Sequence, residues 1–242
     1  MTATNLPTPQ RVLIVMAHPD DAEYFAGGTL AQWAKDGAFL TLLLITSGGK
    51  GSGDLSQRDA DAVAQVREHE TRAAAERLGI KEVIFLRWPD GELTPSLALR
   101  RAIVRMIRLK RPDAVVSSDP LRRWGRGVGS INHPDHYAVA EAVLGAVYPA
   151  ARDHLNFPEL FADEGLEPHK TRWLYMSLPT EANYRVEITD VRADQIAALK
   201  LHTSQVSGDE DWDERMAKRI DEDLTGDGPP RYTEYFRVFD LP

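Results

Sequence analysis

The sequence predicts an α/β protein in which a doubly wound, Rossmann-like and mostly parallel sheet is flanked by helices. Short apolar runs rich in β-branched residues alternate with longer segments of helical spacing, and the connections between them are short. No linker and no internal repeat divides the 242 residues, a length that suffices for one sizeable core. We therefore expect residues 1–242 to form a single domain, with an irregular C-terminal region from about residue 150.

The N-terminal half alternates strands and helices in chain order. Residues 11–17 (RVLIVMA) are an apolar, β-branched run typical of a buried parallel strand. The glycine pair at 27–28 leads into a helical pattern at 30–36, which Gly37 is expected to end. The same reasoning predicts further strands at 39–46, 83–86 and 114–117, and further helices at 59–78, 97–110 and 136–147.

The C-terminal part is less regular. Strands are expected at 172–177 and 184–188, and a helix at 191–201. The acidic segment 209–223 is interpreted as a surface helix or a lid. The aromatic segment 231–239 is expected to pack back onto the domain.

Composition and charge narrow the class of function. The net charge of −8 disfavours binding to nucleic acid and to anionic membranes. The basic cluster within residues 100–111 follows an amphipathic helical pattern, and we interpret it as a solvated helix face. The chain has no cysteine, so any metal site depends on histidine and carboxylate ligands. We find neither a signal peptide in residues 1–10 nor an apolar stretch long enough to span a bilayer, and we expect a cytoplasmic protein that acts on a small molecule.

The first motif with chemical potential is HPDDAE at residues 18–23, directly after the first expected strand. In open α/β sheets, ligands bind beyond the carboxyl ends of the strands, so this position suits a site. Neutral imidazole and carboxylate oxygen are good Zn²⁺ ligands, and Pro19 fixes the backbone between His18 and Asp21. The adjacent carboxylates of Asp20 and Asp21 are costly to bury together without a nearby positive charge, which a divalent cation would supply.

The second motif is HPDH at residues 133–136, after the fourth expected strand and before a helix. One of its two histidines can close the metal site while the other faces the substrate. With His136 as the ligand, the set His18, Asp21 and His136 leaves a fourth position open for water, as in catalytic zinc sites. Either motif alone is explained as well by a turn whose aspartate caps a helix. Because both lie at strand ends of one sheet, the sequence predicts a hydrolase with a single metal ion, zinc.

The two motifs together resemble those of the zinc-dependent N-acetylglucosaminyl deacetylases, a family that includes the GPI-anchor, mycothiol-pathway, bacillithiol-pathway and chitobiose deacetylases. The resemblance extends over nearly the whole chain. It implies a metal-dependent amidohydrolase, assembled as a homo-oligomer, that removes acetyl from an N-acetylglucosamine-type small molecule. Weaker supporting segments are TSGG at 46–49, REHE at 67–70, LG at 78–79, PDGE at 89–92 and KLHTSQ at 200–205.

Carried over residue by residue, the resemblance implies that zinc is bound by His18, Asp21 and His136. Asp20 would then be the general base that takes a proton from the attacking water.

The resemblance implies further roles around the substrate. His133 would face the oxyanion that develops during hydrolysis, and Asp135 would orient His133. Arg67 and Asp90 would line the sugar pocket. From the residues alone, Arg67 also fits a surface ion pair on its Arg/Glu-rich helix, and the Asp90-Gly91 pair fits a simple turn. The remaining histidines are interpreted as structural or surface residues: His69, His154, His169 and His202.

The chain also departs from the family pattern. Ala22 stands where many members have glutamate, with the glutamate displaced to Glu23, and Ile131 stands where some members have a tyrosine. An arginine-rich insertion at 121–130 is expected to reshape the mouth of the site.

Three alternative functions stay open at this point. A non-haem Fe(II) enzyme uses the same two-histidine, one-carboxylate triad. A hydrolase of a non-sugar amide fits the same scaffold, because fold does not fix substrate. A sugar-binding module without catalysis would not need Asp20 and His133.

Overall fold

The computed structural model describes residues 6–54, 56–124, 131–206 and 227–242. Within these ranges one sheet contains the strands β1 (Arg11–Met16), β2 (Phe39–Thr46), β3 (Glu82–Trp88), β4 (Ala114–Ser118), β5 (Trp173–Ser177), β6 (Tyr184–Glu187) and β7 (Thr233–Asp240). Their order across the sheet is β3-β2-β1-β4-β5-β7-β6. The first five positions in this order run parallel, whereas β7 is antiparallel to both β5 and β6. The predicted doubly wound, mostly parallel sheet is therefore confirmed.

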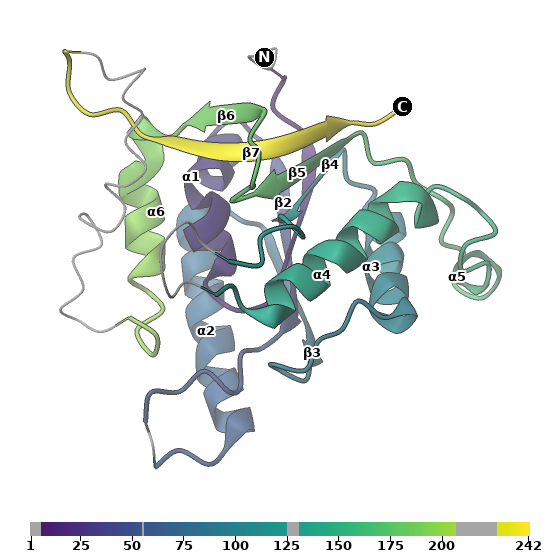
Figure 1. The fold of residues 1–242 in the computed structure, drawn as a ribbon, viewed down its shortest axis with the longest axis horizontal. Coiled ribbons are helices and arrows are strands. Elements are labelled where there is room, and N and C mark those ends of the chain that lie inside the picture. Colours follow the sequence, from purple (N-terminus) through teal and green to yellow (C-terminus); the bar gives the residue numbers. More distant parts are fainter. Residues whose placement is uncertain (1–5, 55, 125–130, 207–226) are drawn as a thin grey trace.

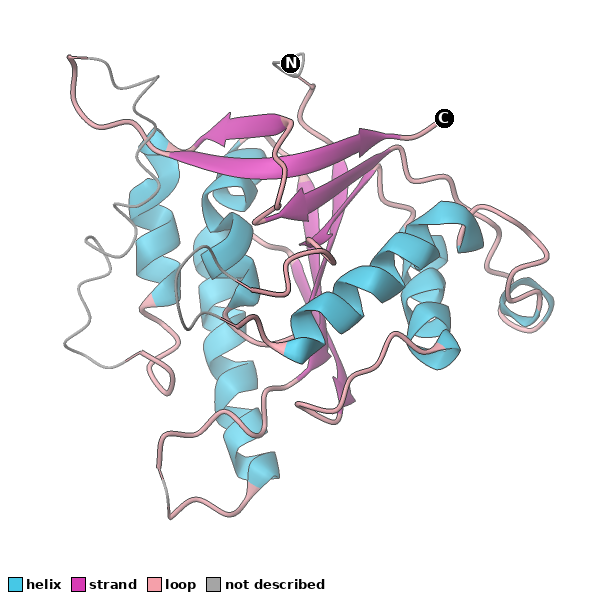
Figure 2. Ribbon diagram, in the orientation of Figure 1, coloured by secondary structure: helices cyan, strands magenta, loops and turns pink. Residues whose placement is uncertain are grey.

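Helices cover both faces of this sheet (Figures 1 and 2). They are α1 (Asp21–Lys35), α2 (Ala60–Leu78), α3 (Leu97–Lys110), α4 (Pro134–Gly145), α5 (Glu159–Ala162) and α6 (Arg192–Leu199). Helices α1, α2 and α6 lie on one side, and α3 and α4 lie on the other. Alternate strand residues feed two cores, because successive side chains of a strand point to opposite faces: Ile14 and Leu42 join the first core, and Val15 and Leu43 the second.

Helix α1 begins earlier than the sequence pattern predicts. The helix was expected from residue 30, after the glycine pair, but it starts at Asp21 and contains both glycines. The reason is close packing: a Cβ on Gly28 would lie 2.7 Å from Cβ of Ile188, and one on Gly27 would lie 2.9 Å from Cγ of Gln195. The glycines therefore permit contact with α6 and with the segment before it, at the usual cost of about 1 kcal/mol each in helix propensity.

The C-terminal region completes the same sheet. The segment at 231–239, expected to pack back onto the domain, supplies β7, which is inserted between β5 and β6. The segment 209–223, interpreted from the sequence as a surface helix or lid, lies outside the described residues. In the part of the chain that is described, no helix has the length and apolar character needed to cross a bilayer.

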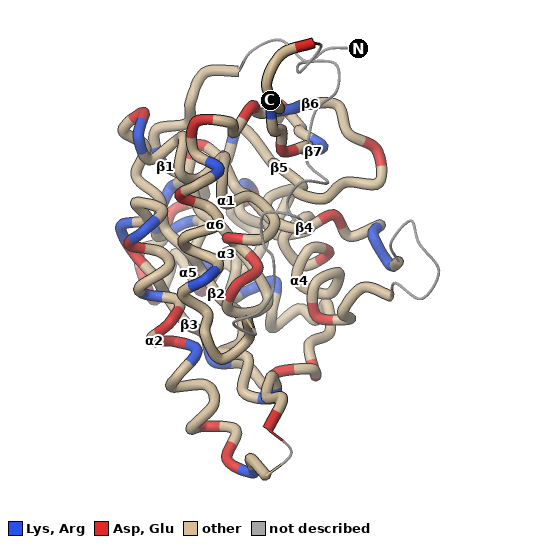
Figure 3. The backbone as a smooth tube through the Cα atoms, turned by 90° about the vertical axis from the view of Figure 1, so that its left-hand side faces the viewer, with Lys and Arg blue, Asp and Glu red and all other residues tan. Residues whose placement is uncertain are grey.

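The basic cluster on α3 is only partly the solvated face that its pattern suggests. Arg101 pairs with Glu159 at 2.7 Å. Arg108 is buried, and its guanidinium donates hydrogen bonds to the backbone carbonyls of Asp153 and Asn156. Seen from the side of α2 and α6, acidic and basic residues are interspersed along the chain (Figure 3). Part of this cluster therefore stabilises the fold and does not simply face the solvent.

Candidate active site

The two HPD motifs meet at the carboxyl ends of β1 and β4, which are neighbours in the parallel sheet. The first motif is a tight turn between β1 and α1, in which Asp20 has a φ of 85°. This left-handed conformation is rare for a residue other than glycine, and such strain is found where function requires it. The second motif opens α4, with His133 as its N-cap and Pro134 in its first turn.

The structure brings His18, Asp21 and His136 together. Nδ1 of His18 lies 3.2 Å from Nε2 of His136, and the same nitrogen of His136 lies 3.0 Å from Oδ1 of Asp21. Nδ1 of His18 is 3.6 Å from Oδ2 of Asp21. One ligand atom from each residue therefore lies within 4.8 Å of the other two.

This arrangement fits a small divalent cation. Two nitrogens bound tetrahedrally to zinc at about 2.0–2.1 Å are separated by about 3.3 Å, close to the separations seen here. The donor set of two imidazoles and one carboxylate suits zinc, and it also suits other transition metals.

Both histidines of this set have their second ring nitrogen engaged. Nδ1 of His136 lies 2.9 Å from Oδ1 of Asn132, whose side-chain amide donates to the carbonyl of Arg122. Nε2 of His18 lies 3.2 Å from carboxylate oxygens of both Asp90 and Asp135. Such partners fix the tautomer and the orientation of a metal-binding ring, and they leave the other nitrogen free for the metal. Asn132 directly precedes the HPDH motif, and this position was the available signal for its role.

The carboxylate of Asp135 does not contact the histidine expected from the sequence. It is fully buried, and it accepts hydrogen bonds from the backbone N–H groups of Gly91 and Leu93 and contacts the ring of His18. His133 is held instead by the backbone N–H of Asp135, which donates to Nδ1 of His133 at 3.2 Å. The sequence predicts that this carboxylate orients His133, but the two groups are not in contact through it. Loop residues 91–93 hold the carboxylate toward His18 instead.

The backbone contact also fixes the tautomer of His133. Since Nδ1 accepts a hydrogen bond, the proton of the neutral ring resides on Nε2. Burial and the neighbouring His18 lower the pKa of His133 below its ordinary value. The geometry thus favours a neutral His133 ring that donates through its Nε2–H.

The electrostatics of the cluster of His18, Asp21 and His136 favour a positive charge at its centre. Burial acts to lower the pKa of His18, but hydrogen bonds with Asp135, Asp21 and Asp90 outweigh it and raise this pKa to about 11. Burial acts to raise the pKa of Asp21, and the adjacent His136 and His18 hold it well below its usual range. The carboxylates around His18 thus favour a cation or a proton at this site.

Asp20 lies beside this cluster and is not part of it. Burial and the adjacent Asp21 raise its pKa to about 6, and Arg67 opposes this shift. Arg67 is buried, and its guanidinium donates to the carbonyls of Pro19 and Gly48, each at 2.9 Å, and lies 3.4 Å from Asp20. The side chain therefore supports the strained turn from within, which excludes the alternative of a mere surface ion pair.

A cavity of about 350 Å³ opens in front of these groups. Asp135 lies behind the cavity wall, as its full burial requires. Among the residues predicted from the sequence, the cavity is lined by His18, Asp20, Asp21, Arg67, Asp90, His133 and His136.

Lys50 is a further residue of the site, whereas His202 is structural, as its sequence interpretation allows. Lys50 contributes to the cavity wall, and its backbone N–H donates to Asp90 at 2.8 Å. His202, interpreted as structural or surface, is fully buried with Nε2 at 3.5 Å from Glu23. Of the arginine-rich insertion, residues 125–130 lie outside the described ranges.

Comparison with known proteins links this geometry to a chemistry. The model of the PIG-L family, described as GlcNAc-PI de-N-acetylase, matches residues 13–147. The chain is 32% identical over 200 residues to the diacetylchitobiose deacetylase of Thermococcus kodakarensis, covering 83% of this chain and 72% of that protein. It is 34% identical over 178 residues to a 1D-myo-inositol 2-acetamido-2-deoxy-alpha-D-glucopyranoside deacetylase of Kineococcus radiotolerans, covering 61% of this chain but 47% of that longer protein. The structure of an N,N'-diacetylchitobiose deacetylase from Pyrococcus horikoshii superposes with a TM-score of 0.83 at 27% identity, covering 96% of this chain and 84% of that one.

Proposed function

Since the chain belongs to the GlcNAc-PI de-N-acetylase (PIG-L) family, we propose that it removes the acetyl group from an N-acetylglucosamine-type small molecule, releasing acetate and a free amine. The observation that carries this proposal is the convergence of His18, Asp21 and His136 beside a separate carboxylate, Asp20, in one cavity. A cluster of this kind combines a metal site with a base that is not a ligand, the combination used in metal-assisted amide hydrolysis.

The proposed metal is Zn²⁺, held by His18, Asp21 and His136. The donor set and its spacing support this choice. Iron in a facial triad would use the same three ligands, but Asp20 and His133 would then have no role.

In the proposed mechanism the protein holds the substrate and moves its protons. A bound divalent cation supplies the Lewis acidity that activates water and polarises the acetyl carbonyl. Asp20 accepts the proton of the attacking water, and a pKa raised toward 6 brings this base close to the working pH. The Nε2–H of His133 donates to the developing oxyanion. Asp20 then returns its proton to the departing amine.

The sugar ring is proposed to lie against Arg67 and Asp90. Together they offer donors and acceptors, which hydroxyl groups require. Both line the cavity with the proposed ligands.

The experiment that tests the function is metal removal followed by substrate selection. Activity on N-acetylglucosamine, scored as released amine, should be lost with dipicolinate and should return with Zn²⁺ or Co²⁺. Full activity in a preparation shown to contain no metal would contradict the proposed mechanism. A higher kcat/KM on an acetyl-lysine peptide than on any N-acetyl sugar would contradict the proposed substrate.

We also propose a cytoplasmic location and a homo-oligomeric assembly. The lack of cysteine is compatible with a reducing compartment. Large exposed apolar side chains around a cavity of about 240 Å³, among them Leu121, Leu144 and Phe239, are compatible with a subunit contact.

A further inference from the structure

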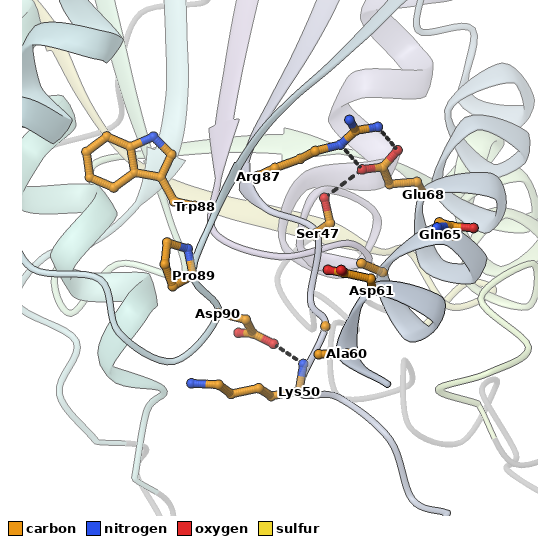
Figure 4. Close-up of a pocket in the computed structure, with 12 residues that line it drawn as sticks. Ser47, Lys50, Ala60, Asp61, Gln65, Glu68, Arg87, Trp88, Pro89 and Asp90 are labelled. Atoms are coloured by element: carbon orange, nitrogen blue, oxygen red, sulfur yellow. Dashed lines mark hydrogen bonds and ion pairs between the residues drawn. The ribbon is translucent and has the colours of Figure 1, made fainter. Parts of the chain in front are cut away.

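A second and larger cavity adjoins the active site. Its volume is about 570 Å³, and it lies between the start of α2 and the end of β3 (Figure 4). Lys50 and Asp90 line both cavities, so the two spaces meet at these residues. The proposed chemistry assigns no role to this second cavity.

One face of α2 supplies polar groups to the second cavity. Asp61, Ala64, Gln65 and Glu68 all line it, and their spacing of three, four and seven residues from Asp61 places them along one stripe of the helix. Asp61 and Gln65 are exposed, and among the described residues no side chain pairs with either of them. The carboxylate of Asp61 and the amide of Gln65 are therefore available to a ligand.

The opposite wall is built by an irregularity of β3. Leu44 pairs with Phe85 and Thr46 with Trp88, so β3 has one residue more than β2 between these pairs. Arg87 lies in this bulge with a φ of 56°, and bulges of this kind re-aim side chains beside active sites. The Nε and Nη2 atoms of Arg87 donate to Glu68 at 2.7 and 3.0 Å, and its exposed Nη1 remains as a donor.

The charges of the cavity lining discriminate between ligands. Asp61, Glu68 and Asp90 contribute three carboxylates. The two cations are already paired, Arg87 with Glu68 and Lys50 with Glu92. An anionic ligand would meet Asp61 without a free cation to compensate it, whereas a hydroxyl-bearing neutral ligand finds both acceptors and donors.

We propose that this cavity is the subsite for the group attached to the glucosamine, and that it takes a neutral polyhydroxylated group bound by Asp61, Gln65 and Arg87. The inference rests on the proposed deacetylase function and adds the class of the attached group. The volume of this second cavity lies within the range of about 300–1,000 Å³ that small-molecule sites occupy.

The first test compares three substrates. They are N-acetylglucosamine, its α-glycoside with myo-inositol and its α-glycoside with L-malate, each scored by kcat/KM for amine release. The two glycosides share the linkage and differ in the charge of the attached group. We expect the inositol glycoside to exceed both others by about tenfold, the gain from one or two well-placed neutral hydrogen bonds. An equal or higher value for the malate glycoside would overturn the proposal.

The second test fills the cavity. Ala64→Phe should lower kcat/KM for the inositol glycoside about tenfold and leave N-acetylglucosamine within about twofold. The matched control is Val66→Phe, an exposed position two residues along α2 and outside the cavity lining, which should change neither value. Asp61→Lys should raise the malate-to-inositol ratio about fivefold.

The outcomes separate the two proposals. If Ala64→Phe affects both substrates equally, or neither, the subsite is wrong while the deacetylase function stands. If wild-type protein loaded with zinc releases amine from none of the three sugars, the function and the subsite are both rejected.

Discussion

Replacing Asp135 with asparagine tests whether its carboxylate orients the metal-binding ring of His18 or acts through His133. Its oxygens accept hydrogen bonds from the N–H groups of Gly91 at 2.8 Å and Leu93 at 3.1 Å, and one oxygen also lies 3.2 Å from Nε2 of His18. Asparagine keeps the shape but offers only one oxygen, and its amide nitrogen is a donor. The substitution therefore removes an acceptor and a negative charge with little change in volume.

The size of the effect follows from these contacts. The oxygen of asparagine is best kept toward Gly91 and His18, where two donors converge, so its amide faces the N–H of Leu93. One buried donor left unpaired costs about 1–3 kcal/mol of stability. Loss of the charge beside His18 weakens the orientation and basicity of a metal-binding ring, which typically costs about 10- to 100-fold in metal affinity, or about 1.4–2.7 kcal/mol.

The assay is the zinc dissociation constant, measured by chelator competition at pH 7, with His133→Ala as the control. Asp135→Asn should weaken zinc binding, whereas His133→Ala should leave it unchanged and lower kcat. If Asp135→Asn instead keeps wild-type zinc affinity and loses only kcat, the carboxylate acts through His133, and the role drawn from its contacts with His18 is refuted.

Two further changes test the site and its support. Asp20→Asn should retain zinc and lose about 10²- to 10⁴-fold in kcat, because Asp20 is a proposed base and not a ligand. If Asp20→Asn loses zinc and Asp21→Asn keeps it, the roles of the two carboxylates are reversed. Glu68→Gln should destabilise the protein by about 1–2 kcal/mol at pH 7, a value reduced for the solvent exposure of its arginine partners. The hydrogen bond from Arg87 is the main cause that holds the pKa of Glu68 near 2, below its ordinary value of 4.5. A carboxylate with a lowered pKa stabilises the fold above pH 4.5, and this stabilisation is lost as the pH falls toward 2. The difference in the free energy of unfolding between variant and wild type, measured in urea, should therefore shrink between pH 7 and pH 3. An unchanged difference would contradict the ion-pair account.

The alternation of strands and helices could be predicted from the sequence, and so could the position of the residues proposed to bind the metal. Residues 11–17 were predicted as a buried strand because their β-branched, apolar character is local information, and β1 spans Arg11–Met16. The prediction that the HPD motifs follow strands also depended only on local order. Because parallel strands end at one edge of a sheet, this order suffices to bring His18 and His136 together across 118 positions.

The start of α1 shows where local information fails. Gly27 and Gly28 normally weaken a helix, so the pattern indicated a loop before residue 30. Close packing against Gln195 and Ile188, far away in the chain, reverses that preference. No local rule contains this contact.

The contacts of the site residues depend on the packing of distant segments. Asp135 is 117 positions from His18 and 44 from Gly91, and the fold, not the HPDH motif, selects these two as its contacts. The second cavity likewise depends on Arg87, which a bulge in β3 turns toward a stripe of α2. Periodicity and residue type encode which elements form and which chemistry they carry, because both act between neighbours in the chain. Hydrogen-bond partners and cavity walls join distant segments, so they are fixed only when the sheet and its helices have packed.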